Sequence, residues 1–402
     1  MELAYTTNEV TTEGMPCHPE NVLTRSNDPH TNWHVMLLVY VFLLAGCSEP
    51  AEQTNADAQN ALERIVLQTD WYAEPEHGGF YLALQRGYYS DAGLDVEIRT
   101  TTTPISVYQL VAADEVQFGL GTSDNLIVAV SRKLPIVGIF PYFQHDPQGV
   151  MFHRDMPIDD FKDLDGRRVK IATGMHYVEY LQRTLGIKLQ LVPMDGSTTQ
   201  FVSDRELVQQ CFLTSEPYFV AQQGVETGVL PFWDMGLDPY RLVMTSTELA
   251  SQRPDLVRRF VMASMRGWSE FMNGDTADAF AAISSRNTQQ SPDFMQWTYG
   301  KMQEYSLVYG RASDGETMGQ IDSGRLQRQI EQLSALDLLG SPVTPEQTMM
   351  FDGYPEVLLV NTLKGSVEEG SVEEGSVEER SVERTPADTD QTIAPVSDQE
   401  KD

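Results

Sequence analysis

Short apolar runs alternate with amphipathic segments through the middle of the chain. Runs rich in β-branched and aromatic residues predict strands at 65–67, 96–98, 116–120, 136–140, 149–153, 168–172 and 189–192. Helical spacing of apolar residues predicts helices at 80–85, 105–113, 126–130, 176–185 and 256–271. This alternation favours an α/β fold with mostly parallel sheets, in which ligands bind beyond the carboxyl ends of the strands.

A second kind of pattern occupies the N-terminal end. Residues 35–46 read VMLLVYVFLLAG, an apolar run too short for a comfortable transmembrane helix but typical of a secretory signal. The ending Leu44-Ala45-Gly46-Cys47 resembles a bacterial lipobox, in which the cysteine receives lipid. We predict a lipoprotein signal region at 1–46, a tether at 47–60, and a periplasmic or cell-surface location with a lipid anchor on Cys47. A buried helix ending in Cys is the alternative, and Arg25 as the sole strong base before the run argues for it.

The C-terminal end is repetitive and acidic. From residue 365 the chain reads GSVEE three times and then RSVER. One valine in five residues cannot bury enough apolar surface to offset the entropy lost on ordering. We therefore predict a disordered acidic tail at 365–402, with an interaction tail as the alternative.

The charge of the chain excludes some classes of partner. The 402 residues include 28 Lys+Arg and 59 Asp+Glu, for a net charge of −31. The segments 1–46 and 365–402 carry −4 and −9, which leaves −18 on residues 47–364. Such a charge repels nucleic-acid phosphates, so no nucleic-acid partner is expected. Three cysteines are too few for a disulfide scaffold, and Cys211 is expected to be packed.

The first candidate cluster follows the strand predicted at 65–67. Asp70, Trp71, Tyr72 and His77 place a carboxylate, two aromatic rings and an imidazole within eight residues. Rings that stack and a carboxylate that accepts N–H bonds suit a planar, hydrogen-bonding ligand. The alternative is a capped helix start with a packed Trp.

Three further clusters stand at strand-to-helix turns. They are Thr122, Ser123, Asp124 and Asn125; Thr173, Gly174, His176 and Tyr177; and Glu216 with Tyr218. Backbone N–H groups and short polar side chains at such turns can face an anionic or carbonyl group. A carboxylate just before Pro217 could bind a ligand amine. Plain helix capping is the alternative for these turns.

The sequence lacks the motifs that mark several common kinds of catalytic and metal site. The histidines show no HExxH spacing, and no nucleophile elbow, P-loop or dinucleotide fingerprint is present. We therefore predict no catalytic residue, no metal site and no cofactor.

The order of motifs resembles one family of solute-binding proteins. The motifs are, in order, Thr69-Asp70-Trp71, His77–Ala83, Arg86–Tyr89, Gly93–Val96, Phe118–Gly121, Leu164–Val169 and Ser215-Glu216-Pro217. The family contains thiamine-precursor (formylaminopyrimidine) binding proteins of ABC importers and fungal pyrimidine-phosphate synthases. Related binders carry riboflavin, alkylsulfonates and nitrate. The resemblance covers roughly residues 62–350.

The resemblance implies a periplasmic-binding-protein fold of type II, with two α/β lobes and a double-crossing hinge. It places lobe 1 at 60–143 plus 240–351 and lobe 2 at 144–239. The ligand would lie between the lobes, which close on it. The clusters at 70–77 and 122–125 would come from lobe 1, and the other two from lobe 2.

Departures from the family pattern separate a binder from a synthase. The synthases carry a pyridoxal-phosphate lysine where this chain has Gly121, and a histidine that is consumed as a substrate where it has Asn125. Their cysteine-rich cluster falls near residues 243–247, which read VMTST. Glycine cannot form a Schiff base, so we expect a binding protein and not an enzyme.

Together these features predict a lipid-anchored solute-binding component of an ABC importer. Its expected partners are a small-molecule ligand, an ABC permease in the inner membrane, and the membrane through the anchor, with the protein itself a monomer. The carboxylates at 70, 124 and 216 favour an amine-bearing planar ligand such as a thiamine-precursor aminopyrimidine. Riboflavin, an alkylsulfonate or nitrate is the alternative ligand. A pyrimidine-synthase-like enzyme and a non-transport sensor lipoprotein are the alternative functions.

Overall fold

The computed structural model describes residues 62–101, 106–172 and 176–350. The signal region predicted at 1–46, the tether at 47–60 with Cys47, and the tail at 365–402 lie outside these residues. The candidates Thr173 and Gly174 also lie outside them. In the described part of the chain, no helix is both long and apolar enough to cross a bilayer.

The first sheet contains strands from two separate stretches of the chain, in the order β2-β1-β3-β10-β4. Its strands are β1 (Glu63–Gln68), β2 (Leu94–Arg99), β3 (Phe118–Thr122), β4 (Ile136–Phe143) and β10 (Arg241–Ser246). Strand β1 pairs in parallel with β2 and β3, whereas β10 runs antiparallel between β3 and β4. Side chains alternate between two apolar layers: Ile65 and Leu67 belong to one core cluster and Val66 to another. Both faces of this sheet are therefore buried.

The second sheet has the order β7-β6-β8-β5-β9. Its strands are β5 (Gln148–His153), β6 (Arg168–Ile171), β7 (Gln190–Pro193), β8 (Val208–Phe212) and β9 (Thr227–Pro231). Strand β6 pairs in parallel with β7 and β8, and β5 runs antiparallel to β8 and β9. In each sheet four of the five strands thus run one way, which confirms the mostly parallel α/β fold. Cys211 is buried in β8, where burial raises the pKa of its thiol.

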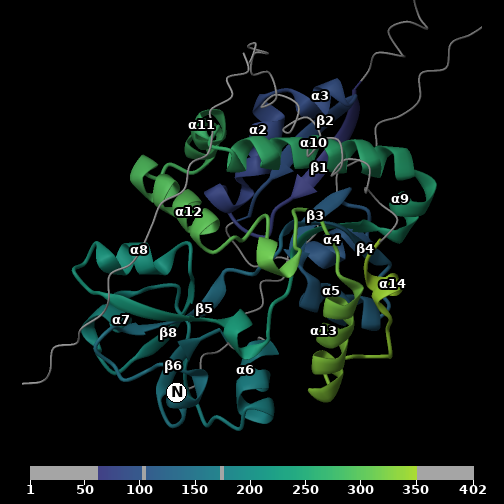
Figure 1. Cartoon of the computed structure of the whole chain (residues 1–402). Coiled ribbons are helices and arrows are strands. Elements are labelled where there is room, and N and C mark those ends of the chain that lie inside the picture. The colour runs from purple at the N-terminus through teal and green to yellow at the C-terminus, as the bar shows by residue number, and fades with distance from the viewer. Residues whose placement is uncertain (1–61, 102–105, 173–175, 351–402) are drawn as a thin grey trace, which may run out of the picture. The chain divides into compact units, whose positions relative to one another are not determined.

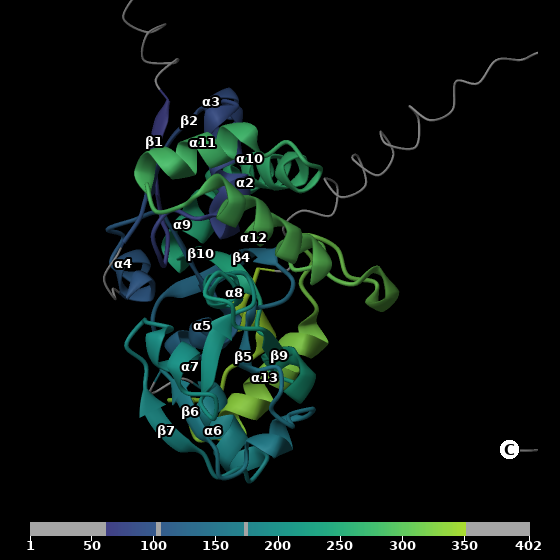
Figure 2. The same ribbon diagram turned by 90° about the vertical axis from the view of Figure 1, so that its left-hand side faces the viewer.

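Helices cover both sheets (Figures 1 and 2). Those of the first lobe are α2 (Gly78–Gln85), α3 (Tyr88–Asp91), α4 (Val107–Ala112), α5 (Ser123–Ser131), α9 (Thr247–Gln252), α10 (Pro254–Met272), α11 (Ala277–Arg286), α12 (Pro292–Glu304), α13 (Ser323–Ala335) and α14 (Pro345–Thr348). Those of the second lobe are α6 (His176–Glu179), α7 (Thr199–Ser203) and α8 (Glu216–Ala221). Shorter turns are η1 (Pro75–His77), η2 (Phe161–Leu164), η3 (Tyr180–Thr184, a π-helical turn), η4 (Phe232–Met235) and η5 (Ala312–Asp314).

The chain crosses twice between the two sheets. The first crossing, residues 144–147, joins β4 to β5, and the second, residues 236–240, follows η4 and leads into β10. The strand after each crossing is the antiparallel one of its sheet. This double crossing is the connection that the sequence predicted, whereas the residue bounds predicted for the two lobes stay a prediction.

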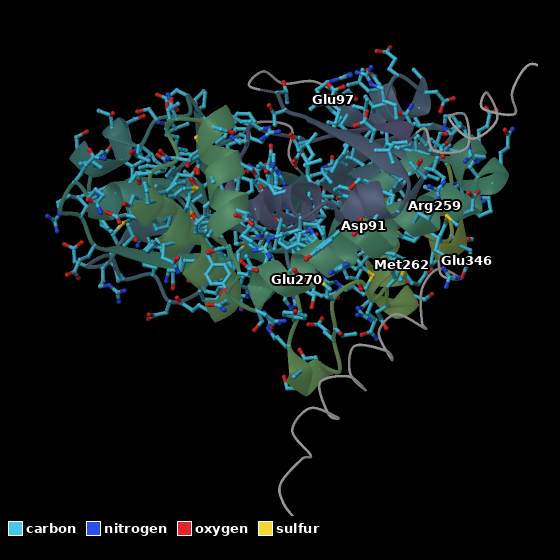
Figure 3. All side chains as sticks on the ribbon, turned by 90° about the horizontal axis from the view of Figure 1, so that it is seen from above. Asp91, Glu97, Arg259, Met262, Glu270 and Glu346 are labelled. Carbon is cyan, nitrogen blue, oxygen red and sulfur yellow. The ribbon has the colours of Figure 1, made fainter. Side chains whose placement is uncertain are left out.

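The longest helix, α10, packs tightly on α2. Its Trp268 is fully buried against Phe80 and Tyr142, with ring centroids 5.5 and 5.7 Å apart. Charged residues of the same helix, such as Arg259 and Glu270, lie at the surface (Figure 3). The close approach depends on glycine, because a Cβ at Gly267 would lie 2.3 Å from the carbonyl oxygen of Gly79.

This contact gives the first prediction. Gly267→Ala should lower the free energy of unfolding by about 1–3 kcal/mol, because a backbone atom blocks the added methyl group. Gly300→Ala is the matched control: it lies within α12 with no atom near its Cβ position, and should raise the free energy by up to about 1 kcal/mol. Urea unfolding measures both. Similar effects of the two changes would contradict the packing argument.

Candidate functional site

Four of the candidate residues after β1 and β8, namely Asp70, Trp71, Tyr72 and Glu216, line one pocket between the lobes, which we call the aromatic pocket. Its cavity volume is about 750 Å³. Its wall is formed by Asp70, Trp71, Tyr72, Glu74, Glu76, Gly196, Ser197, Thr198, Phe212, Ser215, Glu216, Phe219 and Arg241. A pocket of this size has room for a small organic ligand.

Both lobes supply rings to this pocket. Trp71 is 41 % exposed, and its ring centroid lies 5.1 Å from that of Tyr72. Phe219 faces solvent from α8 of the other lobe and is 42 % exposed. The hydroxyl of Thr69 donates to the carbonyls of Trp71 and Arg99, which closes the turn that presents the indole. Large exposed rings next to a cavity indicate a surface for a planar ligand.

Asp70 is not free to bind a ligand cation, because it already has one. Its Oδ2 accepts a hydrogen bond of 2.6 Å from Nη2 of Arg241. His77 is fully buried behind it, with Nε2 3.5 Å from Oδ1 of Asp70, and does not line the pocket. Burial raises the pKa of Asp70, but Arg241 and His77 outweigh it and hold the pKa well below its usual range. His77 is thus packed behind the turn and cannot contact a ligand in this pocket.

The remaining carboxyl groups of the pocket outnumber its positive charges. Burial, opposed by the N–H of Phe212 at 2.7 Å, raises the pKa of Glu216 to about 7. Burial and the neighbouring Glu76 raise the pKa of Glu74 well above its usual range. Among the lining residues, Arg241 is the one Lys or Arg, and Asp70 is paired with it. The pocket therefore favours a ligand that brings positive charge or N–H donors.

One contact of the aromatic pocket joins the two lobes directly. The hydroxyl of Thr214, just after β8, donates to Oε1 of Glu76 in η1. The backbone carbonyl of Thr214 also accepts a hydrogen bond of 2.9 Å from Thr298 of α12. Tyr218, a sequence candidate, does not line the pocket but packs against Phe294 and Trp297 of α12.

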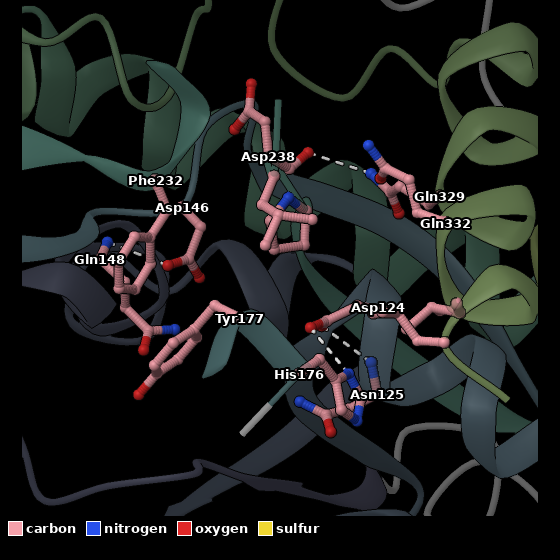
Figure 4. Close-up of a pocket in the computed structure, with 14 residues that line it drawn as sticks. Asp124, Asn125, Asp146, Gln148, His176, Tyr177, Phe232, Asp238, Gln329 and Gln332 are labelled. Carbon is pink, nitrogen blue, oxygen red and sulfur yellow. Dashed lines mark hydrogen bonds and ion pairs between the residues drawn. The ribbon is translucent and has the colours of Figure 1, made fainter. Parts of the chain in front are cut away.

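Asp124, Asn125, His176 and Tyr177 line a different cavity, which we call the small pocket (Figure 4), whereas Thr122 and Ser123 line neither pocket. His176 lies next to Asp124 and Asn125, and Asp146 lies near Gln148 on another part of the wall. Its volume is about 50 Å³, enough for a few atoms but not for a ring system. The structure thus divides the predicted residues between two pockets.

The polar groups after β3 largely satisfy one another. Oδ1 of Asp124 accepts hydrogen bonds from the hydroxyl of Thr122 and the N–H of Asn125, and its Oδ2 lies 3.3 Å from Nδ1 of His176. Burial raises the pKa of Asp124, but His176 outweighs it and the pKa is lowered. Ser123 is fully buried and donates to Gln329. These polar groups are occupied by one another and by distant partners, and the N-cap residue Thr122 makes no side-chain capping bond to α5.

Two residues that sequence reasoning missed stand between the pockets. Arg241 is 4 % exposed; its Nε donates to Oη of Tyr142, and its Nη1 lies 3.7 Å from Oδ2 of Asp146. That Oδ2 accepts no hydrogen bond from the described residues. Burial, only partly offset by Arg241, raises the pKa of Asp146 to about 7. No local motif marks either residue, because each acts on partners far away in sequence.

Within the described ranges, no group of three or more His, Cys, Asp or Glu side chains is placed to hold a metal ion. Gly121, where the family resemblance leads us to expect the synthases' lysine, is enclosed by Tyr108: a Cβ there would lie 2.4 Å from the tyrosine hydroxyl and 2.9 Å from Cε of Met244. A longer side chain at this position would require Tyr108 to move.

The Arg241–Asp70 pair gives a second prediction. Arg241→Met should destabilise more than Asp70→Asn, because it leaves two carboxyl groups without their cation. The double variant should show a coupling of about 1–3 kcal/mol at pH 7. Since the folded pKa of Asp70 is lowered, this stabilisation is present above the unfolded pKa of about 3.9 and is lost as the pH falls below it.

Urea unfolding of the four proteins measures this coupling. Arg168 and Asp204 are the control pair: their atoms are 2.6 Å apart, but the arginine side chain is 42 % exposed, so their coupling should stay below about 1 kcal/mol. Equal couplings for the two pairs would contradict a special role for Arg241.

The raised pKa of Asp146 gives a third prediction. The folded state keeps the proton of Asp146 up to about pH 7, whereas the unfolded state releases it near pH 4. The wild type therefore loses stability as the pH rises from about 4 to 7. An asparagine side chain cannot ionise, so the gain from Asp146→Asn should be about 2 kcal/mol larger at pH 8 than at pH 5. The surface cap Asp163, whose pKa is lowered by the N–H groups of residues 159 and 160, should show no such difference as Asp163→Asn. A gain independent of pH would contradict the assignment.

Two α/β lobes, a double crossing and a ligand-sized pocket between the lobes define a periplasmic-binding-protein fold. Solved structures share it. The periplasmic sulfonate-binding protein SsuA from Methylobacillus flagellatus KT is 12 % identical with a TM-score of 0.57, covering 76 % of this chain and 97 % of its own. The aliphatic sulphonate-binding protein SsuA from Escherichia coli is 12 % identical with a TM-score of 0.54, covering 82 % and 98 %. At these identities the likeness concerns the fold alone.

The chain belongs to the NMT1/THI5-like family, whose sequence profile matches residues 74–277. The formylaminopyrimidine-binding protein of Halalkalibacterium halodurans is 26 % identical over 324 residues, covering 78 % of this chain and 96 % of the relative. The riboflavin-binding protein RibY of Chloroflexus aurantiacus is 23 % identical over 370 residues, covering 79 % and 96 %. A pyrimidine phosphate synthase of Schizosaccharomyces pombe is 31 % identical over only 106 residues, covering 26 % and 31 %.

Proposed function

We propose that this protein is the solute-binding component of an ABC importer and captures a small planar, amine-bearing ligand in the aromatic pocket. A thiamine-precursor aminopyrimidine is the favoured ligand. The observation that carries the proposal is the composition of the pocket, where rings from both lobes surround more carboxyl groups than Arg241 can neutralise. The near full-length relation to a formylaminopyrimidine-binding protein supports it.

The chemistry of capture follows from Trp71 and Glu216. The indole offers a face on which a pyrimidine ring can stack. An aminopyrimidine presents N–H donors next to a ring nitrogen acceptor, and a carboxyl group with a pKa of about 7 can match both, as an acceptor or as a donor when protonated. The N–H of Phe212 holds one oxygen of Glu216 and so orients the group. Since Arg241 neutralises Asp70, Glu216 and Glu74 take the role that the sequence suggested for Asp70.

We further propose that the protein is anchored by lipid on Cys47 and faces the periplasm or the cell surface. The apolar run 35–46 and the lipobox-like ending support this location. From there the protein would deliver its ligand to an inner-membrane permease, with lobe 1 at 60–143 plus 240–351 and lobe 2 at 144–239.

The alternatives fit less well. An alkylsulfonate or nitrate needs a free cation, and Arg241 is already paired with Asp70. A synthase needs a lysine where Tyr108 fills the space beside Gly121. Riboflavin, the ligand in the name of one relative, stays an alternative because the cavity has room for a larger ring system.

The fourth prediction tests the ligand. The full chain, unfolded and refolded to strip bound ligand, is screened by thermal shift against aminopyrimidines, thiamine, riboflavin, taurine and nitrate. A ligand at 100 times its Kd stabilises by about 2.7 kcal/mol, which raises Tm by several degrees. Trp71→Ala should weaken aminopyrimidine binding at least about tenfold. Trp297→Ala, an aromatic deletion outside the pocket, should leave it unchanged.

Any other outcome of the thermal-shift screen would favour one of the alternative ligands or functions. A shift with riboflavin or taurine alone would keep the importer class and replace the ligand. Pyridoxal-phosphate absorbance in the purified protein would favour the synthase-like enzyme. A panel without any shift would favour the sensor lipoprotein.

A further inference from the structure

A buried histidine joins the two crossing segments. His145 of the first crossing is 1 % exposed, with Nδ1 2.6 Å from Oδ2 of Asp238 in the second crossing. Its Nε2 lies 2.8 Å from Oε2 of Glu316. Both ring nitrogens therefore lie within hydrogen-bond distance of a carboxylate oxygen, one on the second crossing and one on Glu316.

Helix α13 holds the same two segments from one side. Arg325, Gln329 and Gln332 are spaced i, i+4 and i+7, which places them on one face of the helix. Nη2 of Arg325 donates to the carbonyl of Gln144 at 2.5 Å and to that of Asp238 at 2.7 Å, so one guanidinium bonds both crossings. Gln329 donates to the carbonyl of Asp238 at 3.0 Å (Figure 4).

The second crossing receives one more bond from the helix. Nε2 of Gln332 donates to the carbonyl of Gly236 at 2.9 Å. This residue touches only the second crossing, whereas Arg325 touches both, and the difference separates their effects in an experiment.

Arg325 also contacts both carboxylates of this cluster. Arg325 lies 3.1 Å from Oδ1 of Asp238 and 3.4 Å from Oε1 of Glu316, and its guanidinium stacks 4.0 Å above the ring of Tyr240. Buried charged groups hold a defined geometry when each has its partners, and removing one partner leaves the others uncompensated.

We propose that His145, Asp238, Glu316 and Arg325 form a crossing clamp that fixes the axis about which the two lobes move, with Arg325 as its positioning residue. The guanidinium holds the carbonyls of both crossings at one point, so the lobes can rotate about that point but cannot slide apart there. The clamp contains no residue of the aromatic pocket, and its role does not depend on which ligand binds.

Amide hydrogen exchange of the ligand-free full chain tests the clamp. The N–H groups of Gln144 and Tyr240 are hydrogen-bonded to Leu307 and Ser123, so their exchange reports opening at each crossing. Arg325→Met should speed exchange at both crossings at least about tenfold while β1 and β6 stay unchanged. Arg328→Met is the matched control, because it removes the same charge from a side chain of α13 that is 68 % exposed, and should change neither crossing.

If Arg325→Met fails to fold, milder variants test the clamp in its place. They also separate the contributions of its residues. Gln332→Ala should speed exchange around Gly236 and leave Gln144 unchanged. His145→Asn, whose amide can reach Asp238 as Nδ1 does, should disturb the crossings less than His145→Gln, which can reach only Glu316. Arg325→Lys keeps the charge but loses the fork, and should fall between wild type and Arg325→Met.

Two results would overturn the proposal. One is unchanged exchange at both crossings in Arg325→Met, and the other is faster exchange spread evenly over the second lobe. Since no ligand enters the experiment, either result leaves the proposed solute-binding function intact. A failed ligand screen would equally leave the clamp untouched.

Discussion

The buried guanidinium of Arg241 is the interaction on which the rest of the site depends. It is supplied by the first residue of β10, the strand that returns from the second lobe and inserts between β3 and β4. There it compensates Asp70 at the wall of the aromatic pocket and stands beside Asp146 of the first crossing. Without it, carboxyl groups from two distant parts of the chain would meet in the interior with no cation between them. The topology of the double crossing and the electrostatics of the cleft are thus linked.

The sequence predicts the fold far better than it predicts the site. Strands β1 to β7 follow from short runs of apolar residues, and most of them are buried on both faces, although β7 is largely exposed. Strands β8 and β10 escape this pattern since Gln210 and Arg241 occupy buried positions that polar partners make tolerable. Their pairing partners lie far away in sequence, so no local window contains the reason.

The polar turns that follow the strands show how far the sequence predicts the candidate site. Sequence reasoning identifies four polar turns, and residues of each of them line one of the two pockets in the described part of the chain. Which ones stay available to a ligand depends on whether their groups find partners: Asp124 finds His176, and Ser123 finds Gln329. Trp71 and Glu216 keep exposed faces toward the larger cavity. Only the three-dimensional arrangement divides the polar groups that already have partners, such as Asp70, from those that face the cavity, such as Glu216.

The contact between Tyr108 and Gly121 limits which residues the chain can accept at position 121. The hydroxyl of Tyr108 fills the space beside Gly121 and accepts the N–H of Thr122 at 2.8 Å. A lysine at position 121 would displace this ring, and removing the ring first would leave a backbone donor without its acceptor. Crowding around one glycine thus ties two positions together: a side chain at 121 requires a change at 108 as well.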